Sequence, residues 1–398
     1  MSRPKTGSVA AVAAGFLGWT LDAFDFFLVV FCLTAIAKDF GESDSAVASS
    51  LAITLAFRPV GAFIFGLLAD RYGRRLPLMI DLIFYSIVEV ATGFAPNFTT
   101  FLILRALFGI GMGGEWGVGA SLAMEKVPAR LRGVLSGLLQ QGYAVGYLLA
   151  AVAYPIVFPR YGWRPLFFLG GLPALLALFV RFRVTESEVW EKTKGAGWQH
   201  LGTMVARNWK LFLYLAVLMT GMNLSSHGTQ DMYPTFLQRF WHFDPSKRSI
   251  ITAISMVGAV LGGVVIGLLS DRVGRKRTIA WSLAAAIVMV PLWAYAPHAG
   301  WLVLGAFLIQ FFVQGAWGVI PAHLTELSPN EIRGFLPGFA YQCGALAAGS
   351  VGTFEALLAR HISYASAMAL TAASVFLFTI LVITFGPERR GREFTTAE

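Results

Sequence analysis

A dense run of polar residues interrupts an apolar segment at positions 221–235, which read GMNLSSHGTQDMYPT. On a helix, residues four positions apart lie on one face. That spacing produces a polar stripe of four residues with two more beside it: Asn223, His227, Asp231 and Thr235, flanked by Ser226 and Gln230. Ionisable groups in hydrocarbon cost at least ~2.5–3.5 kcal/mol each, so they usually face a cavity or a partner. We therefore expect the stripe to line a solute pathway.

The first apolar segment carries two carboxylates, Asp22 and Asp25, three residues apart. This spacing places them on the same face of a helix. Two buried carboxylates side by side disfavour ionising together, so one can hold a proton, which suits a proton carrier. In the alternative interpretation, Asp22 is a capping residue or pairs with Arg105 and never titrates.

Arg58 lies in the apolar stretch LAFRPVGAF. It precedes Asp70 by about three helical turns, which places it well inside the membrane. A permanently charged guanidinium at this depth needs an anion, and its planar fork fits a carboxylate bidentately. That anion is either the carboxylate of a substrate or a carboxylate of the protein, and the sequence leaves both interpretations open.

A glycine-rich segment, RALFGIGMGGE, runs from Arg105 to Glu115. The glycines allow close approach of another helix. Its two ends are ionisable residues, and they either belong to a structural arginine–acid pair or take part in proton coupling. Other candidates are weaker, because aromatic residues in membrane spans more often pack or lie at the interface. Candidates for a cavity wall are Trp116, Trp317, Tyr143, Tyr147, Gln140 and Gln141, and further single acids are Asp81, Glu89 and Glu355.

Composition shows where these residues act. The chain has 398 residues, of which 56% are hydrophobic and only 13% are charged, whereas a soluble domain usually carries roughly a quarter charged residues. Several windows of ~20 residues are almost free of charge, which is enough to span a bilayer as a helix. The sequence therefore predicts an all-α polytopic membrane protein.

Twelve apolar segments follow one another along the chain. They are 8–37, 46–69, 76–96, 99–123, 133–157, 164–181, 211–238, 248–270, 278–297, 300–325, 334–359 and 362–385. They predict twelve transmembrane helices in two six-helix repeats. The expected domains are an N-terminal six-helix bundle at 1–181, a cytoplasmic linker at 182–210, and a C-terminal six-helix bundle with a cytoplasmic tail at 211–398.

Basic residues predict the orientation. With the N-terminus in the cytoplasm, 22 of the 31 lysines and arginines fall in cytoplasmic segments, seven fall on the opposite side and two lie in spans. This asymmetry follows the positive-inside rule and places both termini in the cytoplasm. It also accounts for the net charge of +9 without a nucleic-acid partner. We expect a protein of the plasma membrane, or of the inner membrane in a bacterium.

An internal repeat with an offset of 201 residues organises the chain. GLLADRYGRR at 66–75 matches GLLSDRVGRK at 267–276, and EKVPARLRG at 125–133 matches ELSPNEIRG at 326–334. The carboxylates of the first pair of blocks can accept hydrogen bonds from a helix N-terminus or an arginine, and the glycines allow a tight turn. We expect a latch, broken and remade during function, formed by Gly66, Asp70, Arg71, Gly73, Arg74, Asp271, Arg272, Gly274 and Arg275.

The duplicated loops resemble the signature loop of the major facilitator superfamily, and the Arg105–Glu115 segment resembles the fourth-helix pattern of the same superfamily. The stripe resembles the signature of the Jen1-type lactate and pyruvate:proton symporters within the sialate:H+ symporter group. This resemblance implies His227 and Asp231 as coupling residues and Asn223 and Gln230 as substrate contacts. Proton-linked acid transporters of the superfamily show a similar paired-aspartate pattern in the first span.

These observations predict a secondary active transporter that carries a small monocarboxylate, such as lactate or pyruvate, together with a proton. The expected substrate-binding residues are Arg58, Asn223, His227, Gln230, Tyr143 and Gln140, and the expected proton-coupling residues are Asp22, Asp25, His227, Asp231, Arg105 and Glu115. Parallel repeats place the substrate site near the bilayer midplane, between the halves. We expect no cofactor other than the proton, no metal, and a functional monomer.

Three alternatives remain. The substrate is another organic anion, such as sialic acid, an aromatic acid or a dicarboxylate. The chain is a membrane enzyme that uses His227 and Asp231 as acid and base, which the repeat argues against because an enzyme needs no two-fold rocking. The chain is a transporter-like sensor, for which the central loop is short. No Walker sequence is present, so ATP drive is unsupported.

Overall fold

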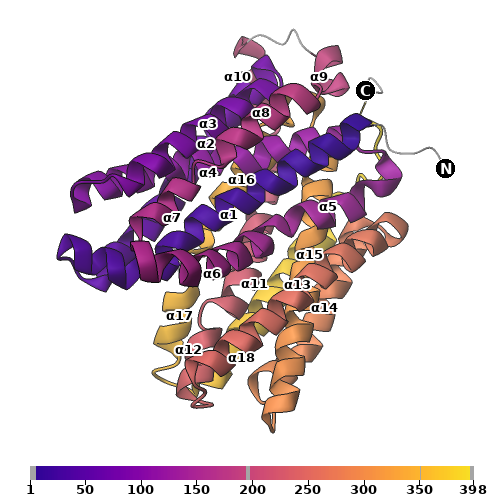
Figure 1. Ribbon diagram of the computed structural model, residues 1–398. Coiled ribbons are helices and arrows are strands. Elements are labelled where there is room, and N and C mark those ends of the chain that lie inside the picture. Colours follow the sequence, from indigo (N-terminus) through magenta and orange to yellow (C-terminus); the bar gives the residue numbers. More distant parts are fainter. Residues whose placement is uncertain (1–5, 194–197, 350, 395–398) are drawn as a thin grey trace.

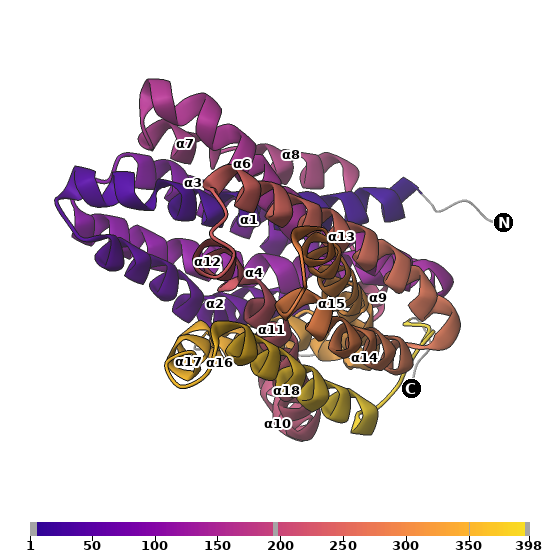
Figure 2. The same cartoon turned by 90° about the horizontal axis from the view of Figure 1, so that it is seen from below.

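The computed structural model describes residues 6–193, 198–349 and 351–394. Within these residues every regular element is a helix, so the all-α prediction is confirmed. The helices of the first half form one bundle and those of the second half form another, shown in indigo to magenta and in orange to yellow in Figure 1. Seen from below in Figure 2, α11 lies where the two bundles meet.

The first bundle contains α1 (Thr6–Phe40), α2 (Asp44–Tyr72), α3 (Arg75–Gly93), α4 (Phe98–Lys126), η1 (Ala129–Leu131), α5 (Arg132–Gln140), α6 (Gly142–Tyr161), α7 (Arg164–Leu169) and α8 (Pro173–Arg183). The connection contains α9 (Glu188–Thr193) and α10 (Trp198–Arg207). The second bundle contains α11 (Trp209–Gln230), α12 (Tyr233–Arg239), α13 (Pro245–Val273), α14 (Arg275–Ala294), α15 (Ala299–Leu327), η2 (Asn330–Ile332), α16 (Leu336–Ala348), α17 (Val351–Leu358) and α18 (Tyr364–Phe385).

Ten helical stretches of the described residues are long and apolar enough to cross a membrane. The other two of the twelve predicted spans, 211–238 and 334–359, each form a pair of shorter helices, α11 with α12 and α16 with α17. In the first pair the polar residues of the stripe lower the hydropathy, and Pro234 in the first turn of α12 cannot continue the preceding helix. The multi-pass architecture is thus confirmed.

Glycines bring α4 against α2. A Cβ on Gly109 would overlap the carbonyl oxygen of Thr54, and a Cβ on Gly113 would overlap that of Arg58. The second half repeats the device, because a Cβ on Gly262 in α13 would overlap the carbonyl oxygen of Phe311 in α15. These contacts seat α2 firmly and so fix the backbone that carries Arg58.

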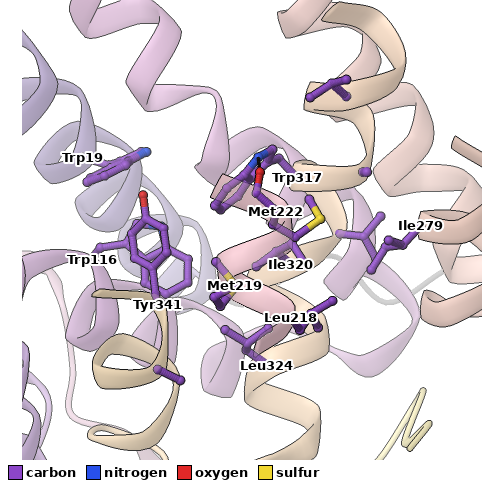
Figure 3. Close-up of a cluster of buried hydrophobic side chains, with 14 of the residues drawn as sticks. Trp19, Trp116, Leu218, Met219, Met222, Ile279, Trp317, Ile320, Leu324 and Tyr341 are labelled. Atoms are coloured by element: carbon purple, nitrogen blue, oxygen red, sulfur yellow. Dashed lines mark hydrogen bonds between the residues drawn. The ribbon is translucent and has the colours of Figure 1, made fainter. Parts of the chain in front are cut away.

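Aromatic side chains from both bundles meet around Tyr341 of α16. Its ring centroid lies 4.6 Å from that of Trp116, 5.6 Å from that of Trp317 and 6.3 Å from that of Trp19. Trp317 donates a hydrogen bond to the Met222 carbonyl (3.2 Å), which ties this cluster to α11 (Figure 3). Each aromatic pair contributes about 0.5–1.5 kcal/mol to stability beyond the effect of its buried area. The centre of the molecule is therefore a tightly packed aromatic cluster.

Candidate functional site

A cavity of about 110 Å³ lies between the bundles and is lined by residues of both. A second space of about 270 Å³ adjoins it. The two share the lining residues Gln140, Tyr143, His227, Gln230, Asp231 and Gln314. We treat them together as the central cavity. Water-lined space between repeats is where a membrane protein tolerates ionisable side chains.

Most of the predicted stripe faces the central cavity. Its lining members are Asn223, Ser226, His227, Gln230 and Asp231. The prediction is wrong for Thr235, which does not line this cavity. Since α11 ends at Gln230 and α12 begins at Tyr233, the helical spacing of four is broken before Thr235 is reached.

His227 of α11 forms a pair with Asp231, the residue that directly follows this helix. The Nδ1 atom of His227 lies 3.2 Å from each carboxylate oxygen of Asp231. Their side chains are 34% and 46% exposed, in a helix that is otherwise largely packed. Imidazole accepts a proton near neutral pH, and an adjacent carboxylate stabilises the charged ring. The pair can therefore take up a proton from water in the cavity.

Side-chain amides surround this pair. Gln230 donates to Gln310 (2.8 Å), and Gln314 donates to Ser226 (2.9 Å). Asn223 donates back to the carbonyl of Met219, one turn earlier in its own helix (2.7 Å). Each primary amide carries two N–H groups, and one of them is used in these bonds. The network holds the amides in place and leaves donors for an anion.

Arg58 lies on the wall of the cavity that the first bundle forms. The residue is 5% exposed, and its Nε and Nη2 groups have no hydrogen-bond partner among the described residues. Its guanidinium lies 5.8 Å from the Trp19 ring and 5.6 Å from the Tyr341 ring. None of the ion pairs within the described part of the chain involves Arg58. The internal ion pair that the sequence left open is therefore not found there.

Two further predicted contacts come from the first bundle. Tyr143 lines the central cavity and stacks on Trp19 with ring centroids 5.6 Å apart. Gln140 also lines it and accepts a hydrogen bond from the Trp116 indole (3.1 Å). Their side chains are thus fixed by aromatic neighbours. Together with Arg58 they form the wall opposite α11.

Arg105 does not reach the cavity. It forms an ion pair with Glu89 (2.7 Å), donates to Thr92 (3.1 Å) and lies 4.6 Å over the Phe108 ring. Arg105 thus belongs to a structural arginine–acid pair, as one interpretation of the sequence had it, and the interpretation in which Asp22 pairs with Arg105 is wrong. Glu89 lies on α3, and the packing of α3 on α4 makes it the partner. Arg58, not Arg105, is the intramembrane arginine that lines the central cavity.

Five carboxyl groups gather inside the first bundle and are at most 1% exposed. This acid cluster consists of Asp22, Asp25, Asp81, Glu89 and Glu115. Its members interact electrostatically with one another and with two arginines, Arg58 and Arg105. Two guanidinium charges cannot neutralise five buried carboxylates, and an isolated buried charge is too costly to persist. The cluster thus contains more acidic groups than its two arginines can neutralise.

The predicted loop carboxylates join the two bundles. Asp70 accepts hydrogen bonds from the backbone N–H groups of Gly334 (2.7 Å) and Phe335 (2.9 Å). Asp271 accepts the symmetric pair from Gly133 (2.8 Å) and Val134 (3.0 Å). Gly66 permits the approach, since a Cβ there would lie 2.8 Å from the Phe335 Cα.

Four residues outside the predicted gating set complete this network. Arg132 pairs with Glu326 across the bundles (3.1 Å), and Arg333 pairs with Glu125 (3.5 Å). Arg74 and Arg275 bind the same two glutamates, each at 3.0 Å. The repeat of EKVPARLRG in ELSPNEIRG is the sequence signal that could have identified them. We call the network the latch: Asp70, Arg74, Glu125, Arg132, Asp271, Arg275, Glu326 and Arg333.

The other predicted gating residues play different parts. Gly73 and Gly274 have φ values of 97° and 116°, which only glycine adopts readily. Arg71 is half-buried beside the Tyr72 ring, and Arg272 is exposed. Neither arginine takes part in the ion pairs that define the latch in the described residues.

Segments that follow each bundle cover the latch. Glu186 accepts hydrogen bonds from the backbone N–H groups of Arg74 and Arg75, and Glu388 accepts those of Arg275 and Lys276, all at 2.9–3.1 Å. The C-terminal segment adds a ring: Phe394 is 3% exposed and lies 3.9 Å from the guanidinium groups of both Arg132 and Arg333. One aromatic ring therefore contacts a cation of each bundle.

The exposure of side chains differs sharply between the latch and the central cavity. The ion-paired side chains of the latch are at most 6% exposed, whereas His227 and Asp231 are 34% and 46% exposed. The bundles are thus closed at the latch and the central cavity is accessible from elsewhere. We call the end of the molecule that carries the latch the latch end.

Comparisons with known proteins agree with this architecture. The family model described as Major Facilitator Superfamily matches residues 15–240 and 231–398. A carboxylic acid transporter protein homolog of Saccharomyces cerevisiae is 29% identical, over 96% of this chain and 68% of that protein. A probable 4-methylmuconolactone transporter of Cupriavidus pinatubonensis is 31% identical, over 95% of this chain and 90% of that protein.

A solved structure shows the same fold. The proton:xylose symporter XylE superposes with a TM-score of 0.78 at 20% sequence identity, covering 98% of both chains. At this identity the likeness concerns the fold alone. It is the fold that the twelve apolar segments and the repeat predicted, so that prediction is confirmed.

Proposed function

Because the chain belongs to the Major Facilitator Superfamily, we propose that it carries a small organic anion across a membrane together with a proton. The membership confirms the resemblance of the loop motifs and the prediction of a transporter rather than an enzyme. The names of two relatives, a carboxylic acid transporter protein homolog and a probable 4-methylmuconolactone transporter, support an organic acid as substrate. Within that class we propose a monocarboxylate of the lactate and pyruvate type.

The observation that carries this proposal is the guanidinium of Arg58 on the wall of the central cavity, whose Nε and Nη2 groups have no hydrogen-bond partner among the described residues. Buried donors without partners are costly, and a carboxylate that accepts two of them recovers that cost. The aromatic rings of Trp19 and Tyr341 flank the guanidinium and limit its movement. Amide donors of Gln230 and Asn223 lie on the facing wall, where they can bind the remaining oxygens of the anion.

The proton neutralises the cargo. We propose that the His227–Asp231 pair takes it from water in the cavity and that Asp22 and Asp25 of the acid cluster complete the coupling set. An anion that travels with a proton presents almost no net charge to hydrocarbon, which lowers the cost of moving it. Coupling arises when the forms that carry only one of the two partners rarely change conformation.

Alternating access then follows from the two bundles. The structure corresponds to the state closed at the latch, and the asymmetry of basic residues supports a cytoplasmic latch end, with both termini inside and a plasma or bacterial inner membrane location. Rocking of the bundles closes the opposite side and breaks the hydrogen bonds of Asp70 and Asp271. The proton and the carboxylate leave into the cytoplasm.

Uptake of labelled lactate into proteoliposomes under an imposed pH gradient tests the proposal. We expect accumulation when the outside is acidic, and its collapse when a protonophore removes the gradient. Equal uptake with and without the gradient would reject proton coupling. Chemical turnover of the solute without accumulation would favour an enzyme.

A cyclic or aromatic monocarboxylate is a second candidate. The cavity walls include the rings of Trp19, Tyr143 and Tyr341, which suit a planar substrate, and one relative is named for a lactone. Competition of lactate uptake by benzoate, a sialic acid and succinate separates the classes. A dicarboxylate needs a second cation, and Arg58 is the arginine that lines the central cavity in the described residues.

A further inference from the structure

We propose that the second bundle binds the headgroup of an anionic phospholipid at its latch end. A pocket of about 560 Å³ lies there between the beginning of α14 and the end of α18. Its principal lining residues are Gly274, Lys276, Arg277, Trp281, Thr384 and Arg390. The pocket is separate from the central cavity and shares no lining residue with it.

The charge of the pocket fits a phosphodiester. Three cations, Lys276, Arg277 and Arg390, face one carboxylate, that of Glu388. The carboxylate is already engaged by the backbone N–H groups of Arg275 and Lys276. Lysine and arginine bind phosphate oxygens by charge-assisted hydrogen bonds, so a net positive pocket remains for an anionic group.

The cations differ in how they are held. Lys276 donates to the carbonyl of Gly386, and Arg390 donates to the carbonyl of Arg272 (2.8 Å). Both bonds orient the side chains and leave further N–H donors on each. Arg277 is exposed and has no hydrogen bond or ion pair within the residues that the structure describes. It is therefore the cation with the most freedom to bind an external phosphate.

The surface beside the cations identifies a lipid rather than a soluble anion. Trp281 is 59% exposed one helical turn beyond Arg277, and on the adjacent α18 Leu381 is 50% exposed. Tryptophan prefers the level of the headgroups, and aliphatic and aromatic side chains beyond it face acyl chains. Basic pockets between helices on the cytoplasmic side are suited to anionic headgroups. Polar and apolar parts thus succeed each other as in a phospholipid.

The two repeats differ at two residues of this pocket, one basic and one aromatic. At the offset of 201 residues, Leu76 stands where the second half has Arg277, and Ile80 stands where it has Trp281. Both first-half residues are 48% exposed, so they lie on a similar surface. The positive-inside rule by itself predicts basic residues in the corresponding loops of both halves. The added cation and the added interfacial aromatic occur in the second half only, which indicates a site rather than a general orientation signal.

The pocket adjoins the latch through shared residues. Glu388 lines the pocket and caps the beginning of α14, where the Arg275 guanidinium binds Asp271 (2.8 Å) and Glu326 (3.0 Å). A headgroup bound to Lys276 and Arg390 would hold α14 and the C-terminal segment together. Bound anionic lipid therefore favours the state closed at the latch.

Native mass spectrometry of the purified full chain tests binding without reference to transport. The probes are dioleoylphosphatidylglycerol, dioleoylphosphatidylcholine and inorganic phosphate. We expect the protein to bind the anionic phosphatidylglycerol more tightly than the zwitterionic phosphatidylcholine. Arg277→Gln should lower the affinity for phosphatidylglycerol about fivefold, and the added substitution Lys276→Gln should lower it about fivefold again. Inorganic phosphate at millimolar concentration should not displace the lipid.

The matched control is Arg183→Gln, which removes an exposed cation at the end of α8 in the first bundle. It should leave the binding of both lipids unchanged. Equal binding of the two lipids, unchanged binding in the double variant, or displacement by inorganic phosphate overturns the proposal. Thermal unfolding of each variant distinguishes loss of the site from loss of the fold. Failure of lactate transport would leave this result untouched.

Discussion

At the scale of single residues, the first bundle carries one arginine on the wall of the central cavity and a cluster of buried acids that does not line it. Arg58 forms no ion pair within the described part of the chain, whereas Arg105 forms one with Glu89. A guanidinium offers five donors in a rigid fork, whereas an ammonium is a strongly hydrated point charge. The two intramembrane arginines of the first bundle therefore differ: Arg105 is held by an ion pair of the fold, and our proposal gives Arg58 the role of binding the substrate.

Replacing Arg58 with lysine tests the fork. Arg58→Lys keeps the charge but loses bidentate capture, and hydrogen bonds to charged groups contribute about 1.5–3 kcal/mol, so the apparent affinity for lactate should fall about tenfold to a hundredfold. The control is Arg164→Lys, because Arg164 pairs with Asp39 at a half-exposed position far from the cavity. Competition binding of lactate measures the change, and unchanged affinity in Arg58→Lys rules out bidentate capture.

Neutralising Asp22 tests the coupling role of the acid cluster. Asp22→Asn removes a proton-carrying group but keeps its volume, so accumulation driven by a pH gradient should be lost. Exchange of labelled for unlabelled lactate should continue, since exchange needs no net movement of protons. Asp39→Asn, at an exposed acid, should retain both activities. Full accumulation by Asp22→Asn would remove this residue from the coupling set.

At the scale of elements, the latch owes its strength to repetition. Each half contributes a carboxylate that binds two backbone N–H groups of the other half, and a glutamate that binds two arginines. Breaking a buried ion pair by removing one partner costs about 3–5 kcal/mol. Two segments cover the latch, the one before α9 and the C-terminal one. We expect their contacts to stabilise the closed latch further.

Removing the ring of Phe394 should loosen the latch. The ring contacts the guanidinium groups of Arg132 and Arg333, and each desolvated cation–π contact is worth up to about 2 kcal/mol. We expect Phe394→Ala to raise the open population about fivefold to thirtyfold. Hydrogen–deuterium exchange of residues 133–140 and 263–270 reports it. Phe385→Ala, which removes an 86% exposed ring, is the control, and equal exchange in both variants would contradict the role of Phe394.

At the scale of the whole molecule, close approach of the two bundles defines the observed state. Backbones touch where glycines face one another, and a Cβ on Gly137 of α5 would overlap the carbonyl oxygen of Gly263 in α13. The cavity, in contrast, leaves His227 and Asp231 accessible. We expect opening and closing to be alternative packings of the two bundles, as for repeats that rock around a central site.

A larger side chain at Gly137 should hold the bundles apart at the latch end. In Gly137→Val the overlap with α13 prevents the closed packing. Double electron–electron resonance between spin labels on α8 and α18 should therefore show a longer distance at the latch end. Active uptake should fall to background. Gly202→Val is the matched control, because a Cβ on Gly202 meets no atom within 4 Å. An unchanged distance distribution in Gly137→Val would exclude this contact as a closure point.

Local physics made much of this architecture readable from the sequence. Partition into hydrocarbon depends on runs of about twenty residues, and side-chain periodicity depends on four, so the apolar segments and most of the stripe followed from spacing alone. The repeat located the loop carboxylates for the same reason, since both copies carry their motif within ten residues.

Partners, however, were decided by tertiary packing. Glu89, sixteen residues before Arg105, became its partner because α3 packs on α4, and Asp70 found its donors 264 and 265 residues away. Sequence spacing contains no information on which helix faces meet across such separations. The break before Thr235, the five acids gathered around two arginines, and the ring of Phe394 between two cations likewise exist only once the helices are packed.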